Sequence, residues 1–200
     1  FYLASKCGCA VVSDPAEGRH VFTRENIVAG VNQSLARMST DYLDFVQFHV
    51  SPSRETLERD GAIDALRDLQ AEGKIRFLGS SSTLPNITDH LDMKVFDEFQ
   101  IPYSALYREH EDVITKSSEA GIGTVIRGGV AQGEPGQGRG REETWQKLEE
   151  AGLDELRGQG ESRSAFVLRF TLTHPNVHTI IAGTKDPAHL KENVDAVLRG

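Results

Sequence analysis

Short apolar runs alternate with longer segments of helical period along almost the whole chain. The clearest strand is residues 43–49, Leu-Asp-Phe-Val-Gln-Phe-His, because aromatic and β-branched residues favour a pleated surface. The same kind of run recurs five more times. The further predicted strands are residues 2–6, 75–80, 96–101, 124–127 and 178–182.

Helical segments separate these strands. Ile27, Val31 and Leu35 recur at i, i+4 and i+8, so they form one apolar stripe of a helix over residues 23–38, with Thr23 as its N-cap. Gly73 follows a second helix, over residues 60–72, as a C′ glycine. The remaining predicted helices cover residues 85–91, 109–120, 145–156, 162–173 and 187–198.

Six strand–helix units follow one another without a change of composition that would mark a linker. Such alternation indicates a parallel sheet, because helical crossovers join parallel neighbours. An open dinucleotide-binding sheet carries G-x-G-x-x-G after its first strand, whereas Gly121-Ile122-Gly123 precedes a strand here. We therefore predict one α/β domain over residues 1–200, a (β/α)8 TIM barrel truncated at the N-terminus to about six βα units.

The charge balance limits the partners. With 22 Lys+Arg against 30 Asp+Glu, the formal net charge is −8, which argues against nucleic acid or an anionic membrane as a partner. An anionic cofactor remains compatible, because it needs only local donors such as helix N-termini. The sequence shows no membrane-spanning run and no signal-peptide pattern, and it has only two cysteines. These features predict a cytoplasmic protein.

Cys7-Gly8-Cys9 resembles half of a metal site. A four-ligand zinc site needs two more ligands, and the seven histidines include no pair at zinc spacing. The sequence therefore predicts no metal and a loop with two free thiols.

In a barrel, the chemistry collects where strands end and in the loops that follow. These positions are Lys6, His49, residues 80–82, residues 100–103, Arg127 and residues 183–185. Taken singly, each has a plain interpretation: a lone Lys is usually solvated in a loop, and a lone His is usually a satisfied polar group.

Taken together, the segments match a known pattern. Ser5-Lys6, Tyr42 to His49, Gly73-Lys74-Ile75-Arg76 to Ser81, Gln100 to Ser104, and Gly183-Thr184-Lys185 to Asn193 occur in the order found in the aldo-keto reductase family. The sequence resembles this family from Tyr2 to about Val197. The resemblance implies reduction of a small aldehyde or ketone by hydride from the reduced form of NADP (NADPH), with NAD as the alternative cofactor.

The same resemblance assigns roles. Lys6 matches the family's catalytic Lys, whose charge lowers the pKa of a Tyr acid, and His49 matches the His that orients the substrate carbonyl. The matches to nucleotide contacts are Ser81, Ser82, Gln100, Arg127, Gly128, Val130, Gly133, Thr184, Lys185, His189, Glu192 and Asn193.

Three of these positions depart from the family pattern. Ser82 replaces an Asn at the nicotinamide carboxamide, Arg127 replaces an aromatic that stacks on the nicotinamide, and His189 replaces a frequent Arg near the adenosine phosphate. Lys185 can still meet that phosphate as a point charge. In the glycine-rich stretch, residues 128–141, the resemblance places residues 128–133 close to the pyrophosphate, where glycines let backbone amides approach. The rest of the stretch, to Arg141, is interpreted either as a lid over the cofactor or as a flexible insertion.

The family's Asp and Tyr have no match in the sequence, so we expect two βα units, carrying both residues, before Phe1. Two other interpretations stay open. One is a non-catalytic member of the fold that binds a nicotinamide nucleotide as a sensor or partner subunit. The other is a barrel isomerase or aldolase that uses Lys6 as a Schiff-base amine. The sequence pattern predicts neither the identity of the carbonyl substrate nor the oligomeric state.

Overall fold

The computed structural model describes residues 1–11, 19–136 and 138–199. Residues 12–18 of the predicted loop after the first strand, and residue 137 of the glycine-rich stretch, lie outside this set. The chain forms two compact units. The first comprises Phe1–Gln100 with Glu119–Gly123, and the second comprises Ile101–Ser118 with Thr124–Gly200.

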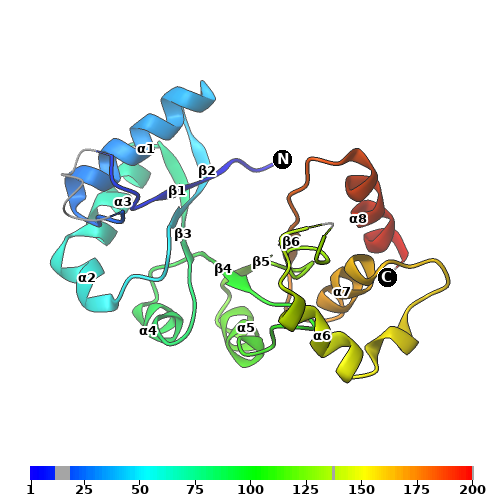
Figure 1. Cartoon of the computed structure of the whole chain (residues 1–200). Helices are drawn as coiled ribbons and strands as arrows, with labels where there is room; N and C mark the ends of the chain where they lie inside the picture. The colour runs from blue at the N-terminus through cyan, green and yellow to red at the C-terminus, as the bar shows by residue number, and fades with distance from the viewer. Residues whose placement is uncertain (12–18, 137, 200) are drawn as a thin grey trace. The chain divides into compact units, whose positions relative to one another are not determined.

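Parallel strands form the centre of the first unit (Figure 1). They are β1 (Ala4–Cys7), β2 (Leu43–Phe48), β3 (Ile75–Ser81) and the start of β4 (Glu98–Pro102), in that order. The register places Gln47 beside both Lys6 and Gly79, and Gly79 beside Glu98. Since side chains alternate along a strand, these four positions share one face.

Four helices accompany these strands: α1 (Arg24–Met38), α2 (Arg54–Arg59), α3 (Ala62–Ala71) and α4 (Asn86–Met93). The predicted stripe of α1 is confirmed, because Ile27, Val31 and Leu35 are buried. Thr23 has the extended backbone of an N-cap, but its side chain makes no capping hydrogen bond.

The short helix α2 was not predicted. It has too few apolar positions for a helical stripe, and Leu57 is its buried residue. Its sequence signal is the cap, since the hydroxyl of Ser53 accepts a hydrogen bond from the amide of Thr56 at 3.2 Å. Gly61, at φ +65°, separates α2 from α3.

In the second unit, β5 (Gly123–Arg127, from Thr124 on) pairs in parallel with β6 (Thr179–Ile181). The helical elements are α5 (Glu111–Glu119, up to Ser118), α6 (Glu142–Glu150), the 3₁₀ turn η2 (Leu153–Leu156), α7 (Arg163–Leu172) and α8 (Pro187–Arg199). The prediction of one helix over 145–156 is wrong. Gly152 takes a left-handed conformation at φ +65° and separates α6 from η2.

The second unit has its own apolar core. One cluster joins Leu106, Trp145, Leu148 and Phe166, and α7 packs against α8 through a second cluster that contains Leu168 and Ala196. Figure 1 shows these two helices side by side. None of the helices in the described ranges is long and apolar enough to cross a membrane.

Candidate active site

A row of polar side chains crosses the sheet of the first unit. The amide of Gln47 donates a hydrogen bond of 2.8 Å to the carboxylate of Glu98, above the intervening residue Gly79. A Cβ on Gly79 would collide with the Glu98 carboxylate and would lie 2.9 Å from the Cγ of Gln47. Glycine is therefore required where these two side chains meet.

Glu98 is the acid of this row, and its pKa is shifted. Only 2% of the residue is exposed, and this burial raises the pKa of its carboxyl to about 7, against the opposing effects of the Gln47 hydrogen bond and the Lys6 charge. Its second oxygen, Oε1, has no hydrogen-bond partner among the described residues. Lys6 thus lies near a buried carboxyl that changes its charge close to neutral pH.

Two predicted nucleotide contacts join the same network. The hydroxyl of Ser81 donates to the side-chain oxygen of Gln100 at 3.4 Å, and the amide of Gln100 donates to Gln47 at 3.3 Å. The structure therefore brings Ser81 and Gln100 together through direct bonds, and Gln47 links them to the row that contains Lys6.

Ser82 lies differently. Its hydroxyl is 2.7 Å from Nδ1 of His90 and 2.9 Å from the hydroxyl of Ser51, and the residue is fully buried. Nε2 of His90 donates to the carbonyl of Pro52 at 2.8 Å, which leaves Nδ1 to accept from Ser82. The side chain of Ser82 thus fastens the turn after β3 to α4, and the structure does not group it with Ser81 and Gln100.

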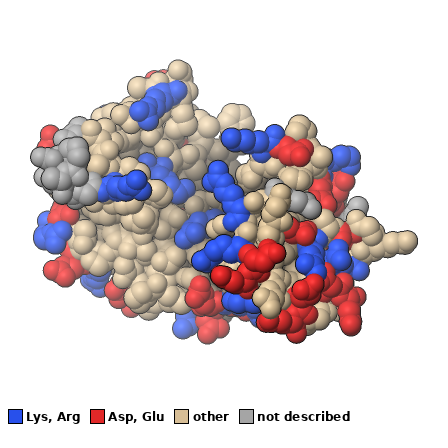
Figure 2. Space-filling model, in the orientation of Figure 1, with Lys and Arg blue, Asp and Glu red and all other residues tan. Residues whose placement is uncertain are grey.

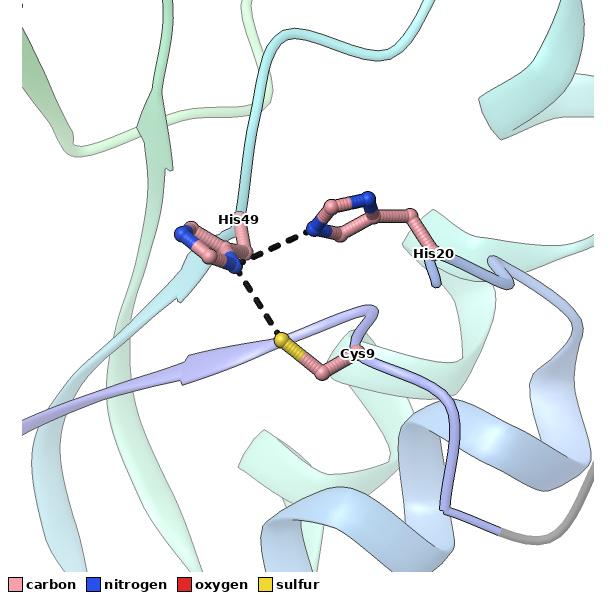
Figure 3. Close-up of side chains that lie close together, drawn as sticks. All are labelled: Cys9, His20 and His49. Carbon is pink, nitrogen blue, oxygen red and sulfur yellow. Dashed lines mark hydrogen bonds between the residues drawn. The ribbon is translucent and has the colours of Figure 1, made fainter. Parts of the chain in front are cut away.

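His49 follows β2 directly, and its backbone amide donates to the carbonyl of Cys7 at 2.8 Å. Its Nδ1 lies 3.1 Å from the sulfur of Cys9 and 3.4 Å from Nε2 of His20 (Figure 3). The sequence interpretation missed this group, because 29 residues separate His20 from His49.

The two cysteines differ in their surroundings. Cys7 lies in β1 and not in the loop where we expected both thiols, and its burial raises the pKa of its thiol. Cys9 is exposed. Strand alternation explains the contrast between Cys7 and its neighbour in the row, Lys6, because successive side chains point to opposite faces.

A pocket of about 780 Å³ lies in the second unit. Three segments line it: the glycine-rich stretch, the start of α7, and the chain from the end of β6 into α8. Seven of the predicted cofactor residues lie on its wall: Val130, Gly133, Thr184, Lys185, His189, Glu192 and Asn193. The sequence interpretation missed Arg139, Ser162 and Ser164, which also line it.

The described part of the glycine-rich stretch is folded into tight turns. The amide of Arg139 donates to the carbonyl of Gln132 at 2.8 Å, and the amide of Gly138 donates to the carbonyl of Glu134 at 2.7 Å. These bonds give the pocket a backbone wall on this side.

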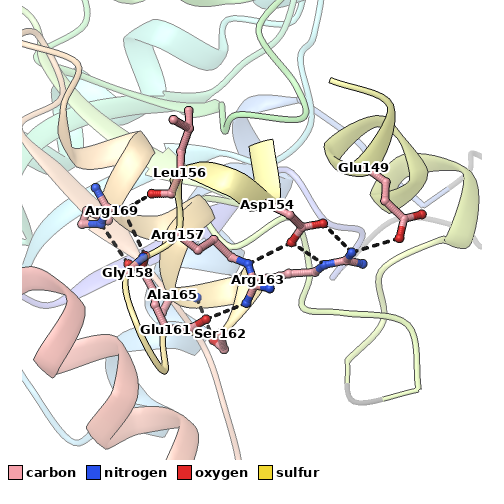
Figure 4. A network of polar contacts seen from close by, with 10 residues as sticks. All are labelled: Glu149, Asp154, Leu156, Arg157, Gly158, Glu161, Ser162, Arg163, Ala165 and Arg169. Carbon is pink, nitrogen blue, oxygen red and sulfur yellow. Dashed lines mark hydrogen bonds and ion pairs between the residues drawn. The ribbon is translucent and has the colours of Figure 1, made fainter. Parts of the chain in front are cut away.

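Ion pairs fix another segment that lines the pocket, the start of α7 (Figure 4). The carboxylate of Glu161, 3% exposed, accepts two hydrogen bonds from Arg169, of 2.8 and 3.0 Å, and one from the amide of Gly158. Arg163 bonds Asp154 through two nitrogens and also reaches Glu149. The first turn of α7, with Ser162 and Ser164, is thereby fixed against the pocket.

Arg127 and Gly128 belong to the second unit but do not line this pocket. Arg127 ends β5, and burial lowers the pKa of its guanidinium. Its Nε is buried and has no hydrogen-bond partner among the described residues. A half-buried cation with an unmatched donor is costly, so it indicates a place where a further group can bind.

Figure 2 shows acidic and basic side chains intermixed around the helices of the second unit. The pocket itself has Lys185 and Arg139 on its wall together with Glu134 and Glu192. It therefore offers both cations for a phosphate and carboxylates for donor groups of a ligand.

The model of the aldo/keto reductase family matches residues 1–199. Among curated proteins, the uncharacterized oxidoreductase YqkF of Bacillus subtilis (strain 168) is 26% identical over 185 residues, which are 85% of this chain and 60% of that protein. Norsolorinic acid reductase A of Aspergillus parasiticus is 25% identical over 201 residues, 90% of this chain and 50% of that protein. The chain thus spans roughly half to three fifths of the length of these two curated relatives.

Solved structures agree. The aldo-keto reductase AKR11C1 from Bacillus halodurans, in its holo form, superposes with a TM-score of 0.81 at 29% identity, covering 98% of this chain and 67% of that chain. Its apo form gives 0.74 at 27% identity. The predicted fold class, an α/β barrel of the (β/α)8 type represented by about six βα units, is confirmed.

Proposed function

Because the chain belongs to the aldo-keto reductase family, we propose that the protein reduces an aldehyde or ketone to an alcohol with a nicotinamide nucleotide. The observation that carries the proposal is the pocket of the second unit, whose wall holds seven of the residues that match the family's nucleotide contacts. Those residues were chosen from sequence motifs, and their position on one pocket wall supports the proposal.

The residues present suit a dinucleotide. Lys185 and Arg139 supply cations for phosphate, and the hydroxyls of Ser162, Ser164 and Thr184 supply donors. The buried Nε of Arg127, which has no hydrogen-bond partner among the described residues, would donate to an acceptor atom of the bound nucleotide. By the family resemblance, the hydroxyl of Ser81 and the side-chain amide of Gln100 match the groups that hold the nicotinamide carboxamide.

Lys6 and His49 are the proposed catalytic residues. A bound NADPH would supply the hydride. The ammonium of Lys6 would lower the pKa of a tyrosine acid, and His49 would orient the carbonyl oxygen of the substrate. The family's Tyr and Asp have no match in the sequence, so Lys6, His49 and the pocket are the parts of the proposed site that this chain supplies.

We propose NADP as the preferred cofactor because Lys185 lies on the pocket wall. His189 lies on the same wall, 3.9 Å from the carboxylate of Asp186. A charge-assisted contact contributes about 1.5–3 kcal/mol. Loss of Lys185 is therefore expected to weaken the binding of NADPH about 10- to 100-fold and that of NADH much less.

The experiment measures binding and turnover separately. NADPH and NADH are titrated against the purified protein by the change in their own fluorescence on binding, and reduction of a panel of aldehydes is followed by loss of NADPH absorbance. Lys185→Ala is compared with Lys116→Ala, an exposed lysine of α5 outside the pocket.

Selective loss of NADPH affinity in Lys185→Ala, with Lys116→Ala unchanged, supports the proposal. Binding without turnover of any aldehyde or ketone would favour the nucleotide-binding sensor instead. Absence of binding to either nucleotide would contradict both.

A further inference from the structure

Cys9, His20 and His49 bring three donor atoms to one point in the first unit. Nδ1 of His49 lies 3.1 Å from Sγ of Cys9 and 3.4 Å from Nε2 of His20, and the three atoms lie within 4.8 Å of one another. Figure 3 shows the side chains converging from the end of β2, from the chain after β1 and from the chain before α1. Neither motif matching nor the proposed reaction accounts for Cys9 and His20.

The spacing suits one metal ion. Zn²⁺ binds sulfur at about 2.3 Å and imidazole nitrogen at about 2.0–2.1 Å, so two ligands in a tetrahedral site are about 3.3–3.6 Å apart. The two short separations here are 3.1 and 3.4 Å. One thiolate with two imidazoles is a donor set that suits zinc more than calcium or magnesium.

Both close contacts of this group meet at one ring nitrogen. Both the thiol of Cys9 and Nε2 of His20 approach the same ring atom, Nδ1 of His49. That nitrogen offers one lone pair in the ring plane or one proton, so it makes one good bond. A cation between the three atoms uses a lone pair of each.

The backbone holds two of the ligands in place. Cys9 and His20 face each other in an isolated antiparallel bridge, flanked by bonds from the amide of Ala10 to the carbonyl of Arg19 (3.0 Å) and from that of Val21 to Gly8 (2.9 Å). These bonds keep the two side chains near each other without a metal, so less order has to be gained on binding.

Asn26, fully buried in α1, stabilises this bridge through hydrogen bonds of its side chain. Its amide nitrogen donates to the carbonyls of Cys9 (2.9 Å) and Val21 (2.8 Å), and its oxygen accepts from the amide of Val11 at 2.8 Å. The bond from the amide of His49 to Cys7 ties the third ligand to the same strand.

Gly8 makes the turn between the two cysteines possible. It has φ +89°, and a Cβ there would lie 2.5 Å from the ring of Phe22. Phe22 in turn packs edge-on against Phe48, with the ring centroids 5.9 Å apart. The turn that exposes Cys9 is thus held by packing as well as by hydrogen bonds.

We propose that Cys9, His20 and His49 bind one Zn²⁺, with the fourth position open to water or a small ligand. The thiol of Cys9 releases its proton on binding. A consequence rests on the proposed function: His49 cannot bind the ion through Nδ1 and also take its place freely at a substrate carbonyl, so zinc and carbonyl reduction compete.

The test reads metal binding directly. The chelator-treated protein is titrated with Co²⁺, and the visible bands of a tetrahedral ion and the near-ultraviolet thiolate-to-cobalt band are recorded. We expect one equivalent to bind and Zn²⁺ to displace it. Cys9→Ser should abolish the thiolate band, and His20→Ala should weaken binding about tenfold or more, since even indirect partners of metal ligands matter to that extent.

Matched controls are Cys7→Ala, which removes the other thiol, and His189→Gln, which removes a histidine of the second unit. Both should bind Co²⁺ as the unchanged protein does. The proposal is overturned if no stoichiometric binding occurs, or if the thiolate band survives Cys9→Ser.

An activity measurement separates the two proposals. If the reductase is active, Zn²⁺ should inhibit it in the unchanged protein, and Cys9→Ser should need at least about tenfold more Zn²⁺ for the same inhibition. Equal inhibition of both would refute the competition at His49. An inactive protein that still shows the cobalt spectrum would contradict the proposed function alone.

Discussion

The two units organise their polar residues in opposite ways. In the first unit, Gln47, Glu98, Gln100 and Ser81 are buried on strands and bonded to one another. In the second unit, the polar residues of the pocket lie on turns, at the start of α7 and along α8, and they are half-buried or exposed. A change in the buried row is therefore expected to affect its bonded neighbours, whereas a change on the pocket wall is expected to affect mainly the binding of the proposed nucleotide.

The largest effect is expected at Lys6. Lys6→Met removes the cation that would assist the acid, and kcat/KM for an aldehyde should fall about 10²- to 10⁴-fold. Steady-state kinetics with NADPH measures this loss. The control is Lys116→Met, the same substitution at an exposed lysine of α5. A loss below about threefold would remove Lys6 from the catalytic set.

Glu98 should make the stability of the protein depend on pH. Its pKa is raised to about 7 in the folded state, so its favourable contribution is complete below about pH 4.5 and is lost as the pH rises through 7. Glu98→Gln should therefore gain roughly 2–3 kcal/mol relative to the unchanged protein between pH 5 and pH 8. Urea unfolding at both pH values measures this gain, and parallel pH curves would contradict it.

Glu161 tests whether the pocket depends on its support. Glu161→Ala leaves Arg169 without its buried carboxylate and should cost about 2–3 kcal/mol of unfolding free energy. Glu149→Ala removes an acid that is 68% exposed and should cost less than about 0.5 kcal/mol. Denaturant unfolding compares the two, and equal losses would show that burial does not distinguish these pairs.

The smallest effect is expected from a gain at the pocket wall. His189→Arg places a permanent charge beside Lys185 and should tighten NADPH binding about three- to tenfold with little change for NADH. Nucleotide titration measures the ratio. A parallel gain for both nucleotides would show that the arginine does not meet the phosphate that distinguishes them.

The sequence predicts the strands well because each is a short apolar run between polar segments, as in residues 43–49 and Leu43–Phe48. It misses what depends on register. Glu98 stands two residues before Gln100 and shares its face, but its bond to Gln47 requires the pairing of two strands through Gly79. The group around His49 likewise depends on the antiparallel bridge between Cys9 and His20, and the spacing of these residues along the sequence does not predict that bridge.

Some of the residues predicted from motif order lie close together in the sequence and line one pocket. Thr184, Lys185, His189, Glu192 and Asn193 lie within one short stretch, and the structure places all five on one pocket wall. Ser82 differs because its hydroxyl is hydrogen-bonded to His90 of α4, so its position depends on that helix. The single-domain prediction stays a prediction, beside two compact units in the structure.

The contrast between Cys7 and Cys9 gives the protein a natural attachment point for a reporter. Cys7 is 1% exposed and its thiol has a raised pKa, so it resists alkylating reagents, whereas Cys9 is exposed and they are the only cysteines in the sequence. A maleimide fluorophore should therefore attach to Cys9 alone. It would stand beside His49 and signal the arrival of ligands there without any engineered mutation.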